Sequence, residues 1–145
     1  MEKNLIAKAS VDIDAPAREV WEGLTDPAII QQYMMGAKVD SEWEKGSVIT
    51  WKGEVKGKKY EDKGQILEIE PSKKLKYSHY SPLSGDKDSP ENYHTVSISL
   101  SGDNQHTKVS LSQDKNATEK AKDESEKNWN MMLEGLKKII EGNKN

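Results

Sequence analysis

The sequence predicts an α+β fold in which a curved antiparallel sheet packs against one long C-terminal helix. Alternating strand patterns fill most of the chain, and an amphipathic helix closes it. Strands and helices do not alternate regularly, as they would around a parallel sheet. At 145 residues, without a long linker, the chain is expected to form a single domain over residues 1–145.

The first strand is expected over residues 7–13, where Ala7, Ala9, Val11 and Ile13 alternate with polar residues. Two short helices should follow. Pro16 and Pro27 favour helix starts, because proline suits the first helical position, where its missing N–H is not needed. The second of these helices is expected to end near Met35.

Six further strand patterns occupy the middle of the chain and are separated by turn residues. They cover residues 37–40, 47–53, 59–70, 73–81, 93–101 and 106–113. The loop at residues 82–90 contains glycine and proline among polar residues. It is expected to be the most mobile internal segment and to form the rim of any cavity.

The last helix is expected over residues 116–141. Asn116 and Glu119 have the spacing of a capping box that would start it. Apolar residues recur there at steps of four, three and four, which places one stripe on one helix face: Trp129, Leu133, Leu136 and Ile140. A helix of roughly 24 residues, ~36 Å long, needs an apolar surface of similar length, and Trp129 is expected to bury most of its ring against it.

Composition excludes several classes of function. The net charge is −3 with both signs interspersed, so no basic surface for nucleic acid is expected. The absence of cysteine excludes disulfides and thiolate chemistry. No apolar run approaches a membrane span and no signal region precedes the first strand, so a cytoplasmic protein is expected. A monomer or a weak homodimer is expected, and the sequence does not decide between them. Neither a cofactor nor a metal is predicted.

Short segments spread over nearly the whole chain resemble one superfamily in their order and spacing. They are Ile13-Asp14-Ala15-Pro16, Val20-Trp21, Leu24-Thr25-Asp26-Pro27, Gly64, Glu68-Ile69-Glu70-Pro71, Leu75-Lys76-Tyr77, Trp129, Leu133 and Leu136. The superfamily is the helix-grip (START-like, SRPBCC) superfamily, and the likeness is greatest to homologues of the C-terminal domain of the activator of heat-shock-protein-90 ATPase. The resemblance implies a curved sheet that grips the last helix, with a cavity between them. Relatives include lipid carriers, polyketide cyclases, hormone receptors and many uncharacterised bacterial proteins, so the fold does not decide the function.

Two histidines share the inward parity of neighbouring strands. Leu75 and Tyr77 set this parity for His79, and the apolar residues that follow His94 set it for that residue. If the strands pair in this register, the two histidines face each other with Cβ atoms ~5 Å apart, near enough for contact or one bridging water. Such a pair could bind a metal, share a proton or bind a polar ligand; the alternative is two histidines at the cavity mouth, bonded to tyrosine hydroxyls or water. No third metal ligand is visible, and related proteins often have tryptophan in place of His79.

Aromatic and soft apolar residues suit a pocket for a hydrophobic ligand, although the same residues could simply fill the core of a protein without phenylalanine. The predicted pocket residues are Trp51, Tyr60, Tyr77, His79, His94, Trp129 and Met132. Trp21 and Trp43 are interpreted as packing residues and His106 as exposed. The carboxylate pair Glu61-Asp62 is interpreted as part of a solvated face.

Three hypotheses of function follow. The first is a binding protein for a small hydrophobic ligand held between the sheet and the last helix. The second, suggested by the family resemblance, is an interaction module for the chaperone heat-shock protein 90. The third is a cyclase or hydrolase with His79 and His94 as acid and base. No nucleophile elbow, phosphate-binding glycine loop or zinc protease motif supports an enzyme.

Overall fold

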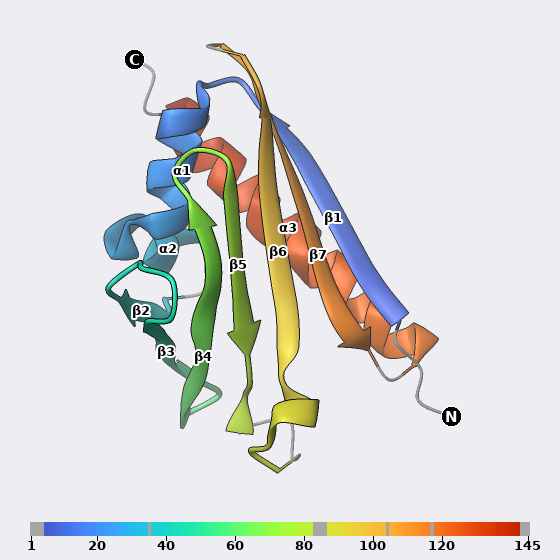
Figure 1. Ribbon diagram of the computed structural model, residues 1–145. Coiled ribbons are helices and arrows are strands. Elements are labelled where there is room, and N and C mark those ends of the chain that lie inside the picture. The colour runs from blue at the N-terminus through green and yellow to red at the C-terminus, as the bar shows by residue number, and fades with distance from the viewer. Residues whose placement is uncertain (1–4, 35, 83–86, 104, 117, 143–145) are drawn as a thin grey trace.

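Seven antiparallel strands form one curved sheet, and the helices lie together on one of its sides (Figure 1). The computed structural model describes residues 5–34, 36–82, 87–103, 105–116 and 118–142. In chain order its elements are β1 (Leu5–Ile13), α1 (Ala17–Thr25), α2 (Pro27–Tyr33), β2 (Lys38–Ser41), β3 (Val48–Val55), β4 (Lys58–Glu70), β5 (Lys74–His79), the 3-10 helix η2 (Pro90–Asn92), β6 (His94–Gly102), β7 (Thr107–Asn116) and α3 (Glu119–Gly142).

The predicted α+β helix-grip architecture is confirmed. The strands are ordered β1-β7-β6-β5-β4-β3-β2, so β1 and β2 are the two edge strands of the sheet. Each expected strand and α-helix is present, with its ends within three residues of the expected ones. The alternation of apolar and polar residues was enough to predict the strands, because one face of nearly every strand packs toward the helices.

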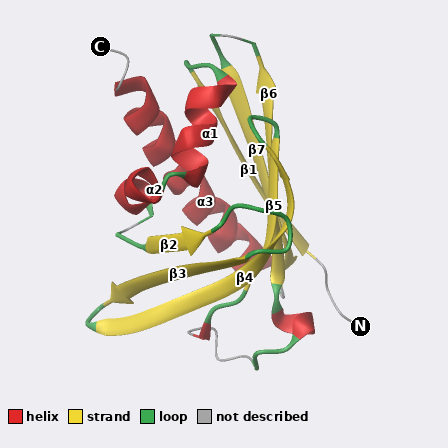
Figure 2. Cartoon of the chain, turned by 60° about the vertical axis from the view of Figure 1, so that its left-hand side comes forward, coloured by secondary structure: helices red, strands yellow, loops and turns green. Residues whose placement is uncertain are grey.

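The sheet bends sharply along β4. Figure 2 shows β3 and β4 turning away from the upright strands β5, β6 and β7 and passing beneath the helices. The register of β4 against β5 shifts between Ile66 and Glu68, which marks a bulge. Just before it, a Cβ atom on Gly64 would lie 1.7 Å from the backbone oxygen of Ser78. Glycine therefore permits a close backbone approach where the sheet curves.

The core lies between the sheet and α3. Leu133, Leu136 and Ile140 of α3 are buried, as their spacing predicted. Helix α1 packs closely on the same helix, because a Cβ atom on Gly23 would come within 2.5 Å of the Leu136 side chain. The sheet contributes inward-facing apolar residues that include Val11, Ile13, Ile49, Ile66, Leu75, Val96, Ile98, Val109 and Leu111.

The expected start of α3 is wrong by three residues. Asn116 does not cap the helix but ends β7, where it is buried and donates hydrogen bonds to the backbone oxygens of Leu5 and Gln113. Thr118 provides the cap instead, because its hydroxyl accepts a bond of 3.0 Å from the N–H of Ala121. The amide of Asn116 is thus used to join β1 to β7.

Trp129 also differs from expectation. Its ring is only partly buried, whereas the three apolar residues that follow it on the stripe are buried. Trp21 and Trp43 pack against the core from its margin, as expected. The part of the Trp129 ring that the core does not cover faces a cavity.

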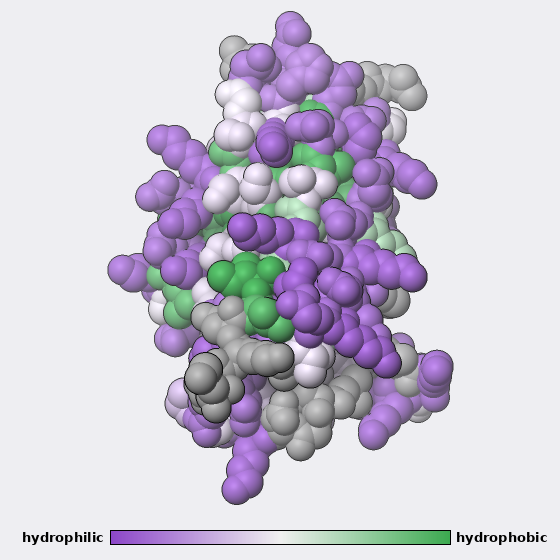
Figure 3. Space-filling model, turned by 90° about the vertical axis from the view of Figure 1, so that its right-hand side faces the viewer, coloured by the Kyte–Doolittle hydropathy of each residue, from purple (hydrophilic) through white to green (hydrophobic). Residues whose placement is uncertain are grey.

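The surface is mainly hydrophilic. In Figure 3, viewed from the right-hand side of Figure 1, charged and polar residues surround a narrow band of less polar ones. Within the described residues, no helix is long and apolar enough to cross a membrane. His106 is exposed as expected and pairs with Asp14 at 2.9 Å.

The expected mobile loop is described only in part, since residues 83–86 lie outside the described residues. Its second half is attached to the sheet through Asp88. That carboxylate pairs with Lys63 and accepts a hydrogen bond of 2.6 Å from the Tyr93 hydroxyl.

Candidate functional site

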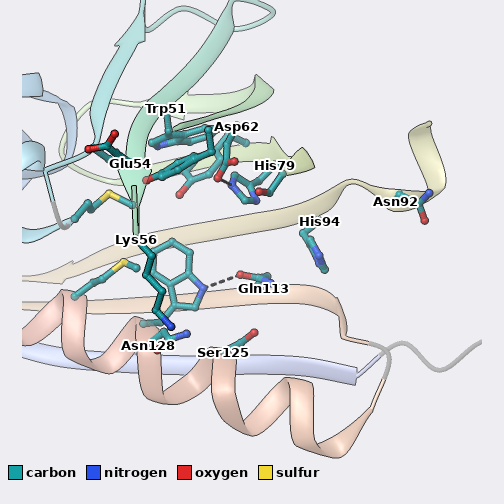
Figure 4. Close-up of a pocket in the computed structure, with 17 residues that line it drawn as sticks. Trp51, Glu54, Lys56, Asp62, His79, Asn92, His94, Gln113, Ser125 and Asn128 are labelled. Carbon is teal, nitrogen blue, oxygen red and sulfur yellow. Dashed lines mark hydrogen bonds and ion pairs between the residues drawn. The ribbon is translucent and has the colours of Figure 1, made fainter. Parts of the chain in front are cut away.

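A cavity of about 550 Å³ lies between the bend of the sheet and α3 (Figure 4). Its lining includes all seven residues that the sequence predicted for a pocket: Trp51, Tyr60, Tyr77, His79, His94, Trp129 and Met132. A smaller cavity of about 30 Å³ adjoins it toward the core and shares Met34, Trp51, Tyr77, Trp129 and Met132. The two cavities therefore lie on either side of the same side chains, between the two layers of the fold.

Five neighbouring strands each contribute at least one side chain to this cavity. β3 provides Trp51, β4 provides Tyr60, β5 provides Tyr77, and β6 and β7 provide His94 and Gln113. The alternation of side chains across the strands puts them on one face. Helix α3 completes the wall from the opposite side with Ser125, Asn128, Trp129 and Met132.

Aromatic rings form the inner wall. The ring centroids of Trp51 and Tyr77 are 5.2 Å apart, and the imidazole of His79 meets Trp51 edge-on at 5.0 Å. Trp51 and Tyr77 are buried. Burial also raises the pKa of the Tyr77 phenol far above its ordinary range, so this hydroxyl remains protonated. The wall is rigid and largely apolar, which suits flat apolar groups.

His79 contacts the carboxylate of Asp62, a residue that the sequence analysis assigned to a solvated face. Its Nε2 lies 2.9 Å from Oδ2 of Asp62. The side chain of Asp62 is only 14% exposed, and its Oδ1 is buried without a hydrogen-bond partner among the described residues. The expectation that Glu61-Asp62 belongs to a solvated face is therefore wrong for Asp62.

The signal that would have identified Asp62 was strand parity. Tyr60 and Ile66 lie on the inner face of β4, and Asp62 shares their parity. Its charge suggested a solvated position, but a neighbouring imidazole makes a largely buried carboxylate tolerable. Asp62 also acts on Tyr60, whose pKa is raised by burial and by the nearby negative charge.

His94 lies directly opposite His79 in the register of β5 and β6, as predicted. Its Nδ1 is 2.8 Å from the backbone oxygen of Asp114. Each imidazole thus has a partner other than the second histidine. Figure 4 shows His79 beside Trp51 and Asp62, and His94 apart from them on the side of α3. The predicted alternative partners, tyrosine hydroxyls or water, are replaced by Asp62 and a backbone carbonyl.

Trp129 connects the helix to the sheet at the cavity wall. Its indole N–H donates a hydrogen bond of 2.7 Å to Oε1 of Gln113 in β7 (Figure 4). The sequence analysis missed Gln113, because a single glutamine near the end of a strand carries no pattern. The bond fixes the orientation of the indole and exposes one part of it to the cavity.

Polar residues surround the mouth of the cavity. Glu54 and Lys56 come from the β3–β4 hairpin, and Asn92 comes from η2. In Figure 4, Lys56 extends from the hairpin toward Asn128 on α3. The cavity thus has an apolar interior, two histidines and a carboxylate along one side, and a mixed charged entrance.

Within the described ranges, no group of three or more histidine, cysteine, aspartate or glutamate side chains is arranged to hold a metal ion. Such groups are the usual ligands of a protein-bound zinc ion.

Comparisons with known proteins support the fold. A family model described as Activator of Hsp90 ATPase homolog 1-like protein matches residues 14–141. Among solved structures, ChR145 of Cytophaga hutchinsonii is 52% identical, with a TM-score of 0.85 over 99% of this chain and 97% of its own. Among curated proteins, the comparison finds no match.

More distant structures share the architecture alone. CalU16 of Micromonospora echinospora is 21% identical, with a TM-score of 0.70 over 97% of this chain and 86% of its own. The Aha1 dimer from Colwellia psychrerythraea is 17% identical, with a TM-score of 0.73 over 97% of this chain and 99% of its own.

Proposed function

The chain belongs to the Activator of Hsp90 ATPase homolog 1-like family, and we propose that it binds a small, mainly hydrophobic molecule in the cavity between the sheet and α3. The observation that supports this most strongly is the cavity itself. Its volume of about 550 Å³ lies in the range of ligand sites, which is roughly 300–1,000 Å³.

The residues around the cavity support binding more than simple packing. Trp129 and Met132 lie on the apolar stripe of α3, yet both are only partly buried. A helix that served only to close a core would bury these positions completely. Here they offer apolar surface to a space large enough for a ligand, and burying that surface would favour binding.

A matched pair of variants tests this proposal. Met132 lines the cavity, whereas its neighbour Met131 is 55% exposed and lies outside that lining. We expect Met132→Trp to fill the cavity and Met131→Trp to leave it open. The uncharged fluorophore N-phenyl-1-naphthylamine should brighten with the wild-type protein and with Met131→Trp, and should do so at least tenfold more weakly with Met132→Trp.

The same fluorescence titration identifies failure. Equal brightening with both variants would place the fluorophore elsewhere on the surface, and no brightening with the wild-type protein would contradict a hydrophobic site. If the fluorophore instead binds in the cavity, native mass spectrometry of protein purified from its own host should show a retained molecule. The mass of that molecule should be missing from the spectrum of Met132→Trp.

The family match keeps an interaction with heat-shock protein 90 as the second candidate. Its matched region spans residues 14–141, which is nearly all of the described structure. A protein that acts by surface contact would change the ATPase rate of the chaperone, and Met132→Trp would not affect that change. Whether the chain is a monomer or a weak homodimer is a separate question, and sedimentation velocity tests it.

A cyclase or hydrolase is the third candidate, supported by the contact between His79 and Asp62 at 2.9 Å. A carboxylate that orients an imidazole is a common arrangement for a general base. This candidate predicts that replacing His79 abolishes a turnover while the affinity for the fluorophore is kept.

A further inference from the structure

We propose that the ligand of this cavity is a flat apolar molecule that carries a neutral hydroxyl group, and that the two pocket histidines accept hydrogen bonds from such a group. This inference rests on the proposed binding function and specifies its ligand class. It follows from the tautomers of the two imidazoles in their neutral form, which their hydrogen-bond partners determine.

His94 is fixed as an acceptor toward the cavity. Its Nδ1 lies 2.8 Å from the backbone oxygen of Asp114, and a carbonyl oxygen can only accept a hydrogen bond. The proton of the neutral ring is therefore on Nδ1, and Nε2 carries the lone pair. Among the described residues, Nε2 has no recorded hydrogen-bond partner, and the side chain lines the cavity.

His79 is fixed in the opposite tautomer with the same result. Its Nε2 lies 2.9 Å from Oδ2 of Asp62, and an ionised carboxylate also only accepts. The proton of the neutral ring is on Nε2, so the lone pair is on Nδ1. In its neutral form, each histidine thus brings an acceptor, and not a donor, to the cavity it lines.

Two carboxylates add negative charge to the lining of the site. Asp62 adds a buried oxygen without a partner among the described residues, and Glu54 adds a second carboxylate at the mouth. A ligand carboxylate would meet lone pairs and negative charge here, which costs free energy. A hydroxyl group supplies the donor that the imidazoles lack and introduces no charge.

The shape of the wall selects the rest of the ligand. Trp51 and Tyr77 present rigid rings whose centroids are 5.2 Å apart, and Trp129 faces them from α3. Flat aromatic groups pack well against such surfaces. Among the described residues that line the cavity, Lys56 at the entrance is the one lysine or arginine, and it lies toward α3, away from His79 (Figure 4).

Three matched probes test the inference: 2-naphthol, 2-methoxynaphthalene and 2-naphthoate. They share one aromatic body and differ in whether they donate a hydrogen bond, only accept one, or carry a negative charge. Affinities are measured by NMR titration at about pH 8, where an ordinary imidazole is neutral. We expect 2-naphthol to bind about three- to tenfold more tightly than the ether, as one net hydrogen bond provides, and 2-naphthoate to bind most weakly.

Histidine variants locate the effect. His94→Phe and His79→Phe should each reduce the preference for 2-naphthol over the ether while retaining affinity for the ether, which also shows that the cavity is intact. His106→Phe is the matched control, because His106 is exposed and does not line the cavity, and it should keep the full preference. If His79→Phe fails to fold without its contact to Asp62, His94→Phe alone decides.

The outcomes separate this inference from the proposed function. If none of the three probes binds, the proposed function fails and the inference fails with it. If the ether or the carboxylate binds as tightly as 2-naphthol, the cavity still binds apolar molecules and only the hydroxyl specificity is wrong. If His94→Phe keeps the full preference for 2-naphthol, the assigned acceptor role is wrong.

Discussion

Trp129 shows how one residue serves both the stability and the site of this fold. Its indole N–H donates to Gln113 at 2.7 Å, and its ring is partly buried beside the cavity. Trp129→Phe keeps most of the ring contacts but loses the hydrogen bond, so we expect a loss of about 1 kcal/mol in the free energy of unfolding. Trp129→Ala should cost about 2 kcal/mol, below the roughly 3–5 kcal/mol of a fully buried tryptophan.

Urea unfolding of both variants and of Gln113→Leu measures these values. In a double-mutant cycle, Trp129→Phe and Gln113→Leu should couple, because they remove two ends of one hydrogen bond. Asn130→Ala is the control, since Asn130 is an exposed residue on the same helix. Additive effects of Trp129→Phe and Gln113→Leu would show that the bond contributes nothing to stability.

Among the pocket residues, the sequence was informative where a side chain followed an apolar pattern. His79 and His94 were placed inward because Leu75, Tyr77 and Val96 fix the parity of their strands. Asp62 has the same inward parity in its strand, but its charge favoured a solvent-exposed position. The partner that makes it acceptable, His79, lies 17 positions away. Such pairs require knowledge of strand register, which a single sequence does not specify.

At the scale of elements, Asp88 attaches the segment around η2 to the sheet. Hydrogen bonds from Lys63 and from the Tyr93 hydroxyl lower the pKa of its carboxyl below the ordinary value of 3.8. A folded-state pKa that is lowered contributes stability above the unfolded-state value, and this contribution is lost as pH falls through the folded-state pKa. The attachment should therefore weaken only in acid, at pH values below 3.8.

Hydrogen-exchange protection of residues 87–92, measured at about pH 5 and pH 3, tests this expectation. Protection should fall in acid in the wild-type protein. Asp88→Asn should show reduced protection at both pH values, because its uncharged amide cannot form the ion pair. Equal protection of the wild-type segment at both values would mean that Asp88 does not hold it.

The free edge of β1 is partly covered by side chains from α3. Even-numbered residues of β1 direct their backbone groups away from β7, toward the edge. Two bonds reach this edge, Lys8 N–H to Glu126 at 2.9 Å and Lys137 to the oxygen of Asp12 at 2.8 Å. A third, from Asp14 N–H to Glu141 at 2.9 Å, follows directly after the strand. An uncovered edge strand would be a template for pairing with another chain.

Removing these side chains should therefore promote self-association. We expect the triple variant Glu126→Ala, Lys137→Ala, Glu141→Ala to sediment as larger species as its concentration rises. The control variant Glu124→Ala, Glu134→Ala, Lys138→Ala changes the charge equally at exposed positions of the same helix and should sediment as the wild-type protein does. Identical sedimentation of the two variants would show that the helix does not protect the edge.

At the scale of the whole molecule, the sequence was enough to predict the architecture but not the size of the cavity inside it. Strand periodicity, two proline-initiated helices and one long apolar stripe predicted the order of elements, because each pattern is local. The cavity depends on how far the sheet bends from α3, which involves the bulge after Ile66 and the close approach at Gly64. The same aromatic residues would fill a tightly packed core if that bend were smaller.

The alkaline stability of the molecule tests how completely its two layers exclude water. Burial holds the pKa of the phenols of Tyr33, in α2, and Tyr77, in β5, far above 10.0. In the unfolded chain both ionise near pH 10. Above that pH the unfolded state loses protons that the folded state keeps, so the free energy of unfolding should fall by about 1.4 kcal/mol per tyrosine for each pH unit.

Urea unfolding at several pH values between about 9 and 11 provides the slope, and the difference between variants isolates each tyrosine from the lysines that titrate in the same range. Tyr33→Phe also loses its hydrogen bond of 2.7 Å to the backbone oxygen of Gly23, which lowers stability at every pH but does not change the slope. Above pH 10, its free energy of unfolding should fall with pH less steeply than that of the wild-type protein, by the contribution of one tyrosine, about 1.4 kcal/mol per pH unit. An unchanged slope would mean that water reaches the phenol of Tyr33, whose side chain is only partly buried, and that desolvation does not hold its pKa high.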